Sequence, residues 1–78
     1  MAKINIREME KLDKNRNAVH EDVKATYTVF IKDGEKYFQI DTYGKSDRKF
    51  VSKVSQAVQL DRAGAIGLIN LLKNEFNL

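Results

Sequence analysis

The sequence contains no cysteine, proline or tryptophan, and its 78 residues include only four glycines and one histidine. Without cysteine, no disulfide can hold the fold and no thiolate can bind a metal ion. The longest apolar run is far shorter than the roughly 18 residues that span a membrane. The N-terminal segment also lacks the apolar core of a signal peptide. We therefore expect one soluble, cytoplasmic domain over residues 1–78 (nucleoid-associated if bacterial), with no membrane partner.

Catalytic groups are equally scarce. His20 is isolated in a polar stretch, the serines have no evident base nearby, and the glycines form no phosphate-binding loop. Asp41 and Asp47 are the only acidic pair that suggests a metal, and surface positions explain them as well. We expect no enzymatic activity, no metal and no cofactor.

The short length favours an oligomer. A chain of this size buries only about 60% of its unfolded surface. Because disulfides are excluded and no metal is expected, association is the remaining way to enlarge the core. The sequence therefore predicts a homodimer.

The net charge of +3 is concentrated in one segment, within a basic loop expected at about 44–55. Residues 44–53 hold four basic side chains against Asp47, whereas the other 68 residues carry 10 basic and 10 acidic side chains. Such a cluster suits a polyanion. The alternative is a solvated loop without a ligand. A polar loop is also expected at about 13–22, and the same alternative applies to it.

A β-hairpin is the clearest predicted element. Alternating runs at 24–32 and 35–43 flank Asp33-Gly34, a dipeptide typical of a type I′ turn. A turn centred there places Val29 opposite Phe38, and Tyr27 opposite Ile40, on an apolar face that we expect to be buried. The opposite face pairs Phe30 with Tyr37, Thr28 with Gln39, and Thr26 with Asp41.

Three further elements follow from periodicity. Alternation over residues 3–9 favours a strand, although 8–12 fits a helix as well. Residues 56–60 predict a short strand with Val58 and Leu60 inward. Asp61 is a good N-cap for a helix over 62–76. The order of elements predicts an α+β fold, an antiparallel four-stranded meander with one C-terminal helix.

The predicted helix has a wide apolar surface. A first stripe suits packing on a sheet and consists of Ala65, Leu68, Ile69, Leu72 and Phe76. The adjoining Ile66 and Leu71, together with Gly64 and Gly67, suggest a dimer interface in which bare backbone admits a second helix. Tolerated glycines in a short terminal helix are the alternative.

Exposed aromatic rings beside lysines would suit unpaired bases. Phe30 and Tyr37 share the predicted non-core face, and Lys24 and Lys32 lie on the same strand face. Stacking of a base on such a ring contributes about 1–3 kcal/mol. A simple cross-strand pair that stabilises the sheet is the alternative.

Two motifs resemble a known family. The segment FQIDTY at 38–43 precedes the basic loop, and AVQLD at 57–61 leads into the amphipathic helix. This order resembles the transcriptional coactivator family positive cofactor four, including its small bacterial and phage-encoded members, over about 24–76. The resemblance implies a dimeric strand meander with one helix, whose sheet presents aromatic and basic residues to single-stranded DNA.

By position, the resemblance implies base stacking for Phe30 and basic contacts around the turn for Lys32 and Lys36. The chain departs from the family at three places: Lys53 to Ser55 replace a Pro-Gly, Gly44 replaces a large aromatic residue, and Asp41 stands at a commonly basic position.

We therefore expect a homodimeric single-stranded DNA-binding protein, largely independent of base sequence and similar to a transcriptional coactivator. The expected nucleic-acid contacts are Phe30, Tyr37, Lys24, Lys32, Lys36, Lys45, Arg48, Lys49 and Lys53. RNA is an alternative ligand. A protein-interaction module on the same fold, such as a phage-encoded inhibitor or adaptor, is the alternative function. Duplex recognition is disfavoured because the predicted helix carries only Arg62 and Lys73 as basic residues.

Overall fold

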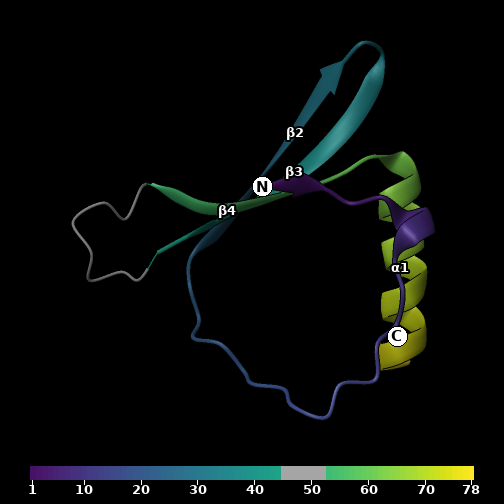
Figure 1. Ribbon diagram of the computed structural model, residues 1–78. Coiled ribbons are helices and arrows are strands. Elements are labelled where there is room, and N and C mark those ends of the chain that lie inside the picture. Colours follow the sequence, from purple (N-terminus) through teal and green to yellow (C-terminus); the bar gives the residue numbers. More distant parts are fainter. Residues whose placement is uncertain (45–52) are drawn as a thin grey trace.

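The protein is described by a computed structural model, in which residues 1–44 and 53–78 are placed. The described elements form an α+β fold, with a four-stranded sheet and a C-terminal helix (Figure 1). Their order along the chain is β1 (Ala2–Lys3), the 3₁₀ turn η1 (Ile6–Glu8), β2 (Ala25–Lys32), β3 (Glu35–Tyr43), β4 (Val54–Leu60) and α1 (Arg62–Phe76).

The sheet is mixed, so the prediction of a purely antiparallel meander is wrong at one edge. The strand order is β1-β4-β3-β2, and the three long strands do form an antiparallel meander. The short β1 pairs in parallel with β4 through Ala2 opposite Val58 and Lys3 opposite Gln59. Parallel pairing needs a long connection, which the intervening chain supplies.

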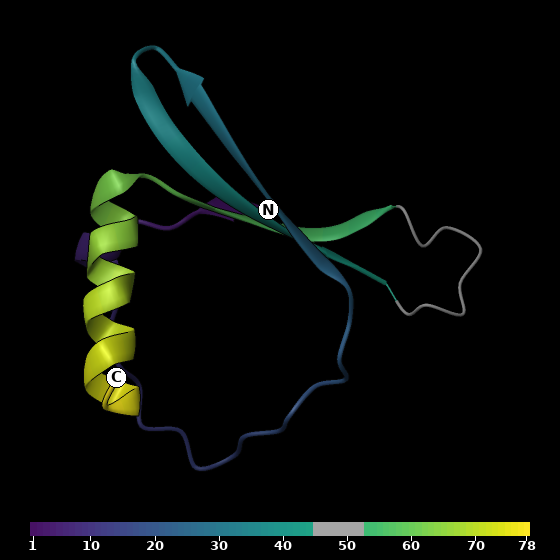
Figure 2. The same cartoon turned by 180° about the vertical axis from the view of Figure 1, so that it is seen from behind.

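The β2–β3 hairpin has the predicted register. Asp33 and Gly34 adopt positive φ angles of 53° and 79°, as a type I′ turn requires. Phe30 therefore pairs with Tyr37, and Val29 pairs with Phe38. The hairpin projects from the sheet, while α1 flanks the end of β4 (Figures 1 and 2).

The N-terminal strand predicted over residues 3–9 is largely wrong. Only Lys3 belongs to β1, and the chain then turns because the Asn5 side chain accepts a hydrogen bond from the Arg7 backbone N–H, 3.1 Å away. This cap starts η1, which lies beside α1 in both views (Figures 1 and 2). Residues 9–24, all of them described, contain no helix or strand, and this stretch includes the polar loop expected at about 13–22.

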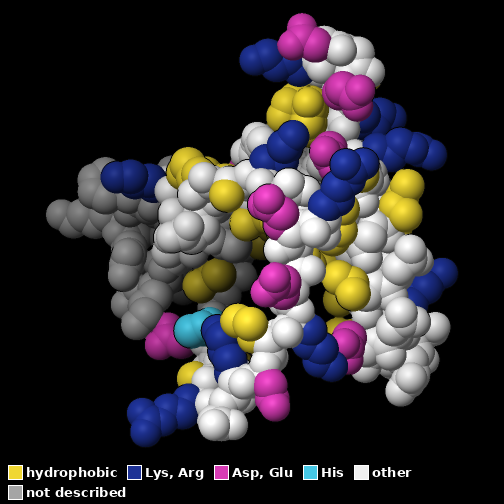
Figure 3. Space-filling view, turned by 45° about the vertical axis from the view of Figure 1, so that its right-hand side comes forward, with side chains coloured by type: hydrophobic (Ala, Val, Ile, Leu, Met, Phe, Trp, Pro, Cys, Tyr) yellow, Lys and Arg dark blue, Asp and Glu magenta, His cyan; other side chains and the backbone are white. Residues whose placement is uncertain are grey.

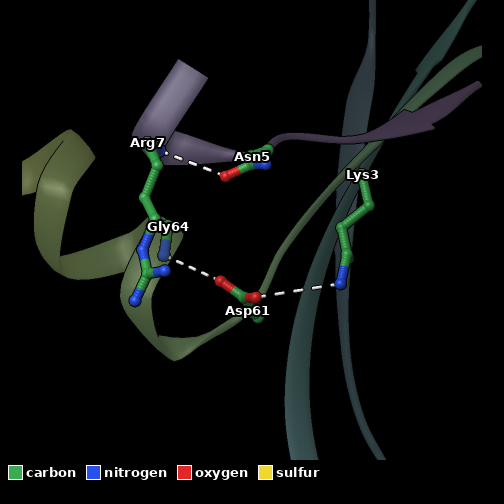
Figure 4. A network of polar contacts seen from close by, with 5 residues as sticks. All are labelled: Lys3, Asn5, Arg7, Asp61 and Gly64. Carbon is green, nitrogen blue, oxygen red and sulfur yellow. Dashed lines mark hydrogen bonds and ion pairs between the residues drawn. The ribbon is translucent and has the colours of Figure 1, made fainter. Parts of the chain in front are cut away.

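Helix α1 has its predicted bounds and cap. The Asp61 side chain accepts a hydrogen bond from the Gly64 N–H at 2.8 Å, and its other oxygen lies 3.8 Å from the Lys3 ammonium (Figure 4). Strand β4 begins at Val54, two residues earlier than predicted, because Tyr43 pairs with Val54 beyond an irregularity in the ladder. Two residues of the basic loop predicted at about 44–55 are described outside β4, namely Gly44 and Lys53. The last two residues of that predicted loop belong to β4.

The apolar surface of the sheet, which we expect to be buried, is largely open among the described residues of a single chain. We call the side of the sheet with Tyr27, Val29, Ile31, Phe38, Ile40, Val58 and Leu60 the apolar face. Among described apolar side chains only Ala57 and Leu60 are buried, while Tyr27 and Ile31 are each 67% exposed. Local sequence sets which side chains share a face, but covering that face requires packing that α1 does not provide here.

Candidate nucleic-acid interface

The opposite side of the sheet, here called the polar face, collects the predicted DNA-contacting aromatics. It comprises Lys3 from β1, Thr26, Thr28, Phe30 and Lys32 from β2, Glu35, Tyr37, Gln39, Asp41 and Tyr43 from β3, and Ala57 and Gln59 from β4. Because alternate residues of a strand point to opposite sides, the observed register fixes this grouping.

Phe30 and Tyr37 form a stacked pair on the polar face. Their ring centroids are 5.3 Å apart, and their planes are inclined by 26°. Phe30 is 37% exposed and Tyr37 is half-buried, so neither ring is sealed inside the protein. An open aromatic pair of this kind can stack an unpaired base.

Lys3 adds a cation beside this pair. Its ammonium lies 5.8 Å from the centroid of the Tyr37 ring, within the range of a cation–π contact. The parallel pairing of β1 with β4 brings it there. The sequence did not indicate this role for Lys3. The alternation of apolar and polar residues around Lys3 favours a strand, but it does not show with which strand that segment pairs.

A polar row crosses the middle of the face. The Gln59 side-chain amide donates to Gln39 Oε1 at 2.7 Å, and the Gln39 amide donates to Asp41 Oδ1 at 2.9 Å. All three residues are half-buried. A hollow adjoins the row and is lined by Met1, Ala2, Lys3, Gln39, Ala57 and Gln59.

A second aromatic residue lies beyond the row. The hydroxyls of Tyr43 and Thr26 share a hydrogen bond of 2.9 Å, and the Lys24 ammonium lies 5.7 Å from the Tyr43 ring centroid. Rings with nearby cations therefore stand at both ends of the face. Between them lie amides and one carboxylate.

The predicted basic residues are distributed unevenly. Lys24 and Lys32 are exposed on the side of β2 that carries Phe30. Lys36 pairs with Ile31, which places it on the opposite side of the hairpin. Lys53 is exposed immediately before β4. The predictions for Lys45, Arg48 and Lys49 lie outside the described residues.

Charge of both signs covers the described surface. Figure 3 shows acidic side chains interspersed with Lys and Arg on the face in view. The polar face itself follows this pattern: Lys3, Lys24 and Lys32 lie around a central Asp41, and Glu35 lies opposite Lys32. Phosphate attraction would therefore concentrate at the margins of the face.

The predicted dimer-interface residues separate into two groups. Ile66 and Leu71 are 50% and 41% exposed on α1. Gly67 instead lies against Ile6 of its own chain, and Gly64 is buried beside Leu60 and Asp61. The close approach at Gly67 is thus made by η1, in place of the second helix that the sequence suggested.

An apolar hollow separates α1 from the sheet. Its apolar lining comes from Val29, Phe38 and Leu60 on the sheet and from Ala65, Ile66 and Ile69 on the helix. Tyr27 and Phe38 stack beside it with centroids 5.0 Å apart. The hollow thus lies between the apolar face and α1, and charged side chains also line it, namely Glu35, Lys36, Asp61 and Arg62.

His20 and the acidic side chains are the groups that could serve catalysis or metal binding. His20 is exposed, and no group of three or more metal-ligating side chains occurs in the ranges 1–44 and 53–78. Within those same ranges, no helix has the length and apolarity to cross a bilayer. Comparison of the chain with protein-family models, with curated proteins and with solved structures found no match.

Proposed function

We propose that this protein binds single-stranded nucleic acid, DNA in particular, on the polar face and does so as a homodimer joined through the apolar face. The observation that carries the proposal is the open Phe30–Tyr37 stack with the Lys3 ammonium beside it. Bases would stack on the rings, which tolerate any base, while the surrounding lysines neutralise phosphates.

The spacing of the aromatic residues supports a strand of several nucleotides. Tyr37 and Tyr43 are six residues apart on one face of β3, which corresponds to about 20 Å at 3.3 Å per residue. Two stacking positions at this separation suit a flexible strand whose bases are unpaired, because the bases of a duplex already stack on one another. The resemblance of 38–43 and 57–61 to positive cofactor four adds support for single-stranded DNA and for a coactivator-like role in transcription.

The homodimer is supported by how little a single chain buries. Its accessible surface is 7372 Å², whereas a compact monomer of its mass exposes about 4,850 Å². Its Cα radius of gyration is 14.8 Å, whereas a compact domain of 78 residues has about 11.5 Å. A second copy would cover the apolar face and Ile66, Ile69 and Leu72 of α1, which are about half exposed.

Fluorescence anisotropy with a labelled 12-nucleotide oligo-dT tests the binding. We expect an affinity that falls steeply as salt rises, and weaker binding to a duplex of equal length. Phe30→Leu removes the π-face but keeps the apolar packing on Tyr37, so it should weaken binding by about 1–3 kcal/mol. Phe30→Tyr keeps the ring and is the matched control. Equal affinities for wild type and Phe30→Leu would refute the proposed stacking.

A protein-interaction module is the second candidate function. The large apolar face supports it, because exposed patches of this kind mark protein interfaces. The two candidates differ in a simple measurement: an interaction module would show no salt-sensitive binding to oligo-dT even at low ionic strength.

A further inference from the structure

We infer that the row formed by Gln59, Gln39 and Asp41 makes the polar face favour bases that carry an exocyclic amino group over thymine. This preference presupposes the single-stranded DNA binding proposed above and adds a base class to it. The selective group is the Asp41 carboxylate.

The direction of the hydrogen bonds fixes what the row presents. Gln59 Nε2 donates to Gln39 Oε1, and Gln39 Nε2 donates to Asp41 Oδ1. The chain of donated hydrogen bonds thus runs from Gln59 through Gln39 and ends at Asp41. A carboxylate has only acceptors, so the row ends in acceptor capacity beyond the one bond from Gln39.

The cross-strand neighbours of Asp41 do not use that capacity. Asp41 pairs with Thr26 on β2 and with Ala57 on β4. The Thr26 hydroxyl is bonded to the Tyr43 hydroxyl, and Ala57 carries no polar group. Because Asp41 is only half-buried, a ligand on this face can reach its carboxylate.

The charge of Asp41 determines which part of a nucleotide approaches it. A carboxylate repels phosphate, so the backbone would follow the lysines at the margins and a base edge would face the row. Asp41 is two residues from Tyr43 on the same face of β3, about 7 Å away, which is within reach of a base stacked on that ring.

Base chemistry then decides the preference. Cytosine, adenine and guanine each carry an amino group that can donate to a carboxylate, and aspartate accepts from cytosine N4 in this way. Thymine has no amino group, and its carbonyl lone pairs would face the carboxylate. Cytosine and thymine have rings of the same size, so comparing them isolates this difference.

The test compares labelled dC12 and dT12 by anisotropy at pH 8 and equal salt. Wild type should bind dC12 at least about five-fold more tightly than dT12. This factor is close to the smallest discrimination between bases that a specific base contact provides. Asp41→Asn is isosteric and can accept from Gln39 while turning its own N–H₂ to the base. It should therefore abolish the preference or invert it towards dT12.

Asp33→Asn is the matched control. It removes the same charge at the hairpin turn, where Asn tolerates the positive φ, and it should leave the dC12 to dT12 ratio unchanged. Two results would overturn the preference and leave the proposed function standing. One is equal affinity of the wild type for dC12 and dT12, and the other is an unchanged dC12 to dT12 ratio in Asp41→Asn. Failure of both oligonucleotides to bind at low salt would overturn both.

Discussion

Ile6 packs directly on the bare backbone of Gly67. A Cβ added at Gly67 would overlap the Ile6 side chain, with Ile6 Cδ1 only 2.9 Å away. The turn capped by Asn5 holds Ile6 there, so this contact fastens η1 to α1. It also explains a glycine inside a helix, where alanine is otherwise favoured by about 1 kcal/mol.

Gly67→Ala should destabilise the fold despite its better helix propensity. The added methyl forces Ile6 or η1 to move, and overpacking of this kind costs about 1–3 kcal/mol. Urea denaturation at fixed protein concentration measures the change. In an Ile6→Ala background the overlap is gone, so the same substitution should become stabilising by up to about 1 kcal/mol. Equal effects in both backgrounds would contradict the contact.

Asp61→Ala should lower the free energy of unfolding by about 0.5–2 kcal/mol, because the Gly64 N–H loses its acceptor. Asp61→Asn keeps the cap and loses only the exposed ion pair with Lys3, which is worth about 0–1 kcal/mol. The melting temperatures of wild type and Asp61→Asn should therefore be similar, and that of Asp61→Ala should be clearly lower. If Asp61→Asn lowered the melting temperature as much as Asp61→Ala, the loss of stability would come from the ion pair with Lys3 and not from the cap.

Gly34→Ala should destabilise the hairpin by about 1–2 kcal/mol, the cost of a left-handed conformation for a residue with a Cβ. Nothing lies within 4 Å of the position of the new methyl, so the cost is conformational and not steric. Asp33→Asn at the neighbouring turn position should leave the melting temperature unchanged. A neutral Gly34→Ala would argue against the type I′ turn.

The parts of the fold that sequence predicted correctly depend on local chemistry. Asp33-Gly34 determines the turn, the turn sets the register of Phe30 with Tyr37, and Asp61 marks the start of α1. Each of these features is decided by residues close together in the chain, so their patterns carry the information.

The errors concern contacts between distant segments. The parallel pairing of Lys3 with Gln59 joins residues that are far apart in the chain, and no local pattern indicates it. For the same reason the sequence did not reveal the Lys3 ammonium beside Tyr37. It also suggested that Gly67 contacts a second helix, whereas Gly67 contacts Ile6 of the same chain. Burial of the apolar face was predicted from alternation alone, which identifies a face but not what covers it.

Lys3→Gln should weaken binding of oligo-dT and reduce its salt dependence. If the ammonium beside Tyr37 neutralises one phosphate, the slope of log K against log salt should become shallower by about 0.7. Lys73→Gln, on the last turn of α1, removes the same charge away from the polar face and should leave the slope unchanged. Identical slopes for wild type and Lys3→Gln would place Lys3 outside the phosphate contacts.

Adjacent residues of β2 provide the test of the dimer. Val29 is 52% exposed on the apolar face, and Thr28 is exposed on the polar face. Light scattering at micromolar concentration should give twice the mass of the chain for wild type and for Thr28→Asp, because both retain the apolar face.

Val29→Asp introduces a charge that association would bury, so it should yield monomer. Because one chain buries only Ala57 and Leu60 among its described apolar side chains, that monomer should also lose cooperative thermal unfolding. Thr28→Asp introduces the same residue into the same strand and controls for the poor strand propensity of aspartate. A wild-type protein that is monomeric and still unfolds cooperatively would show that the open apolar face needs no second copy.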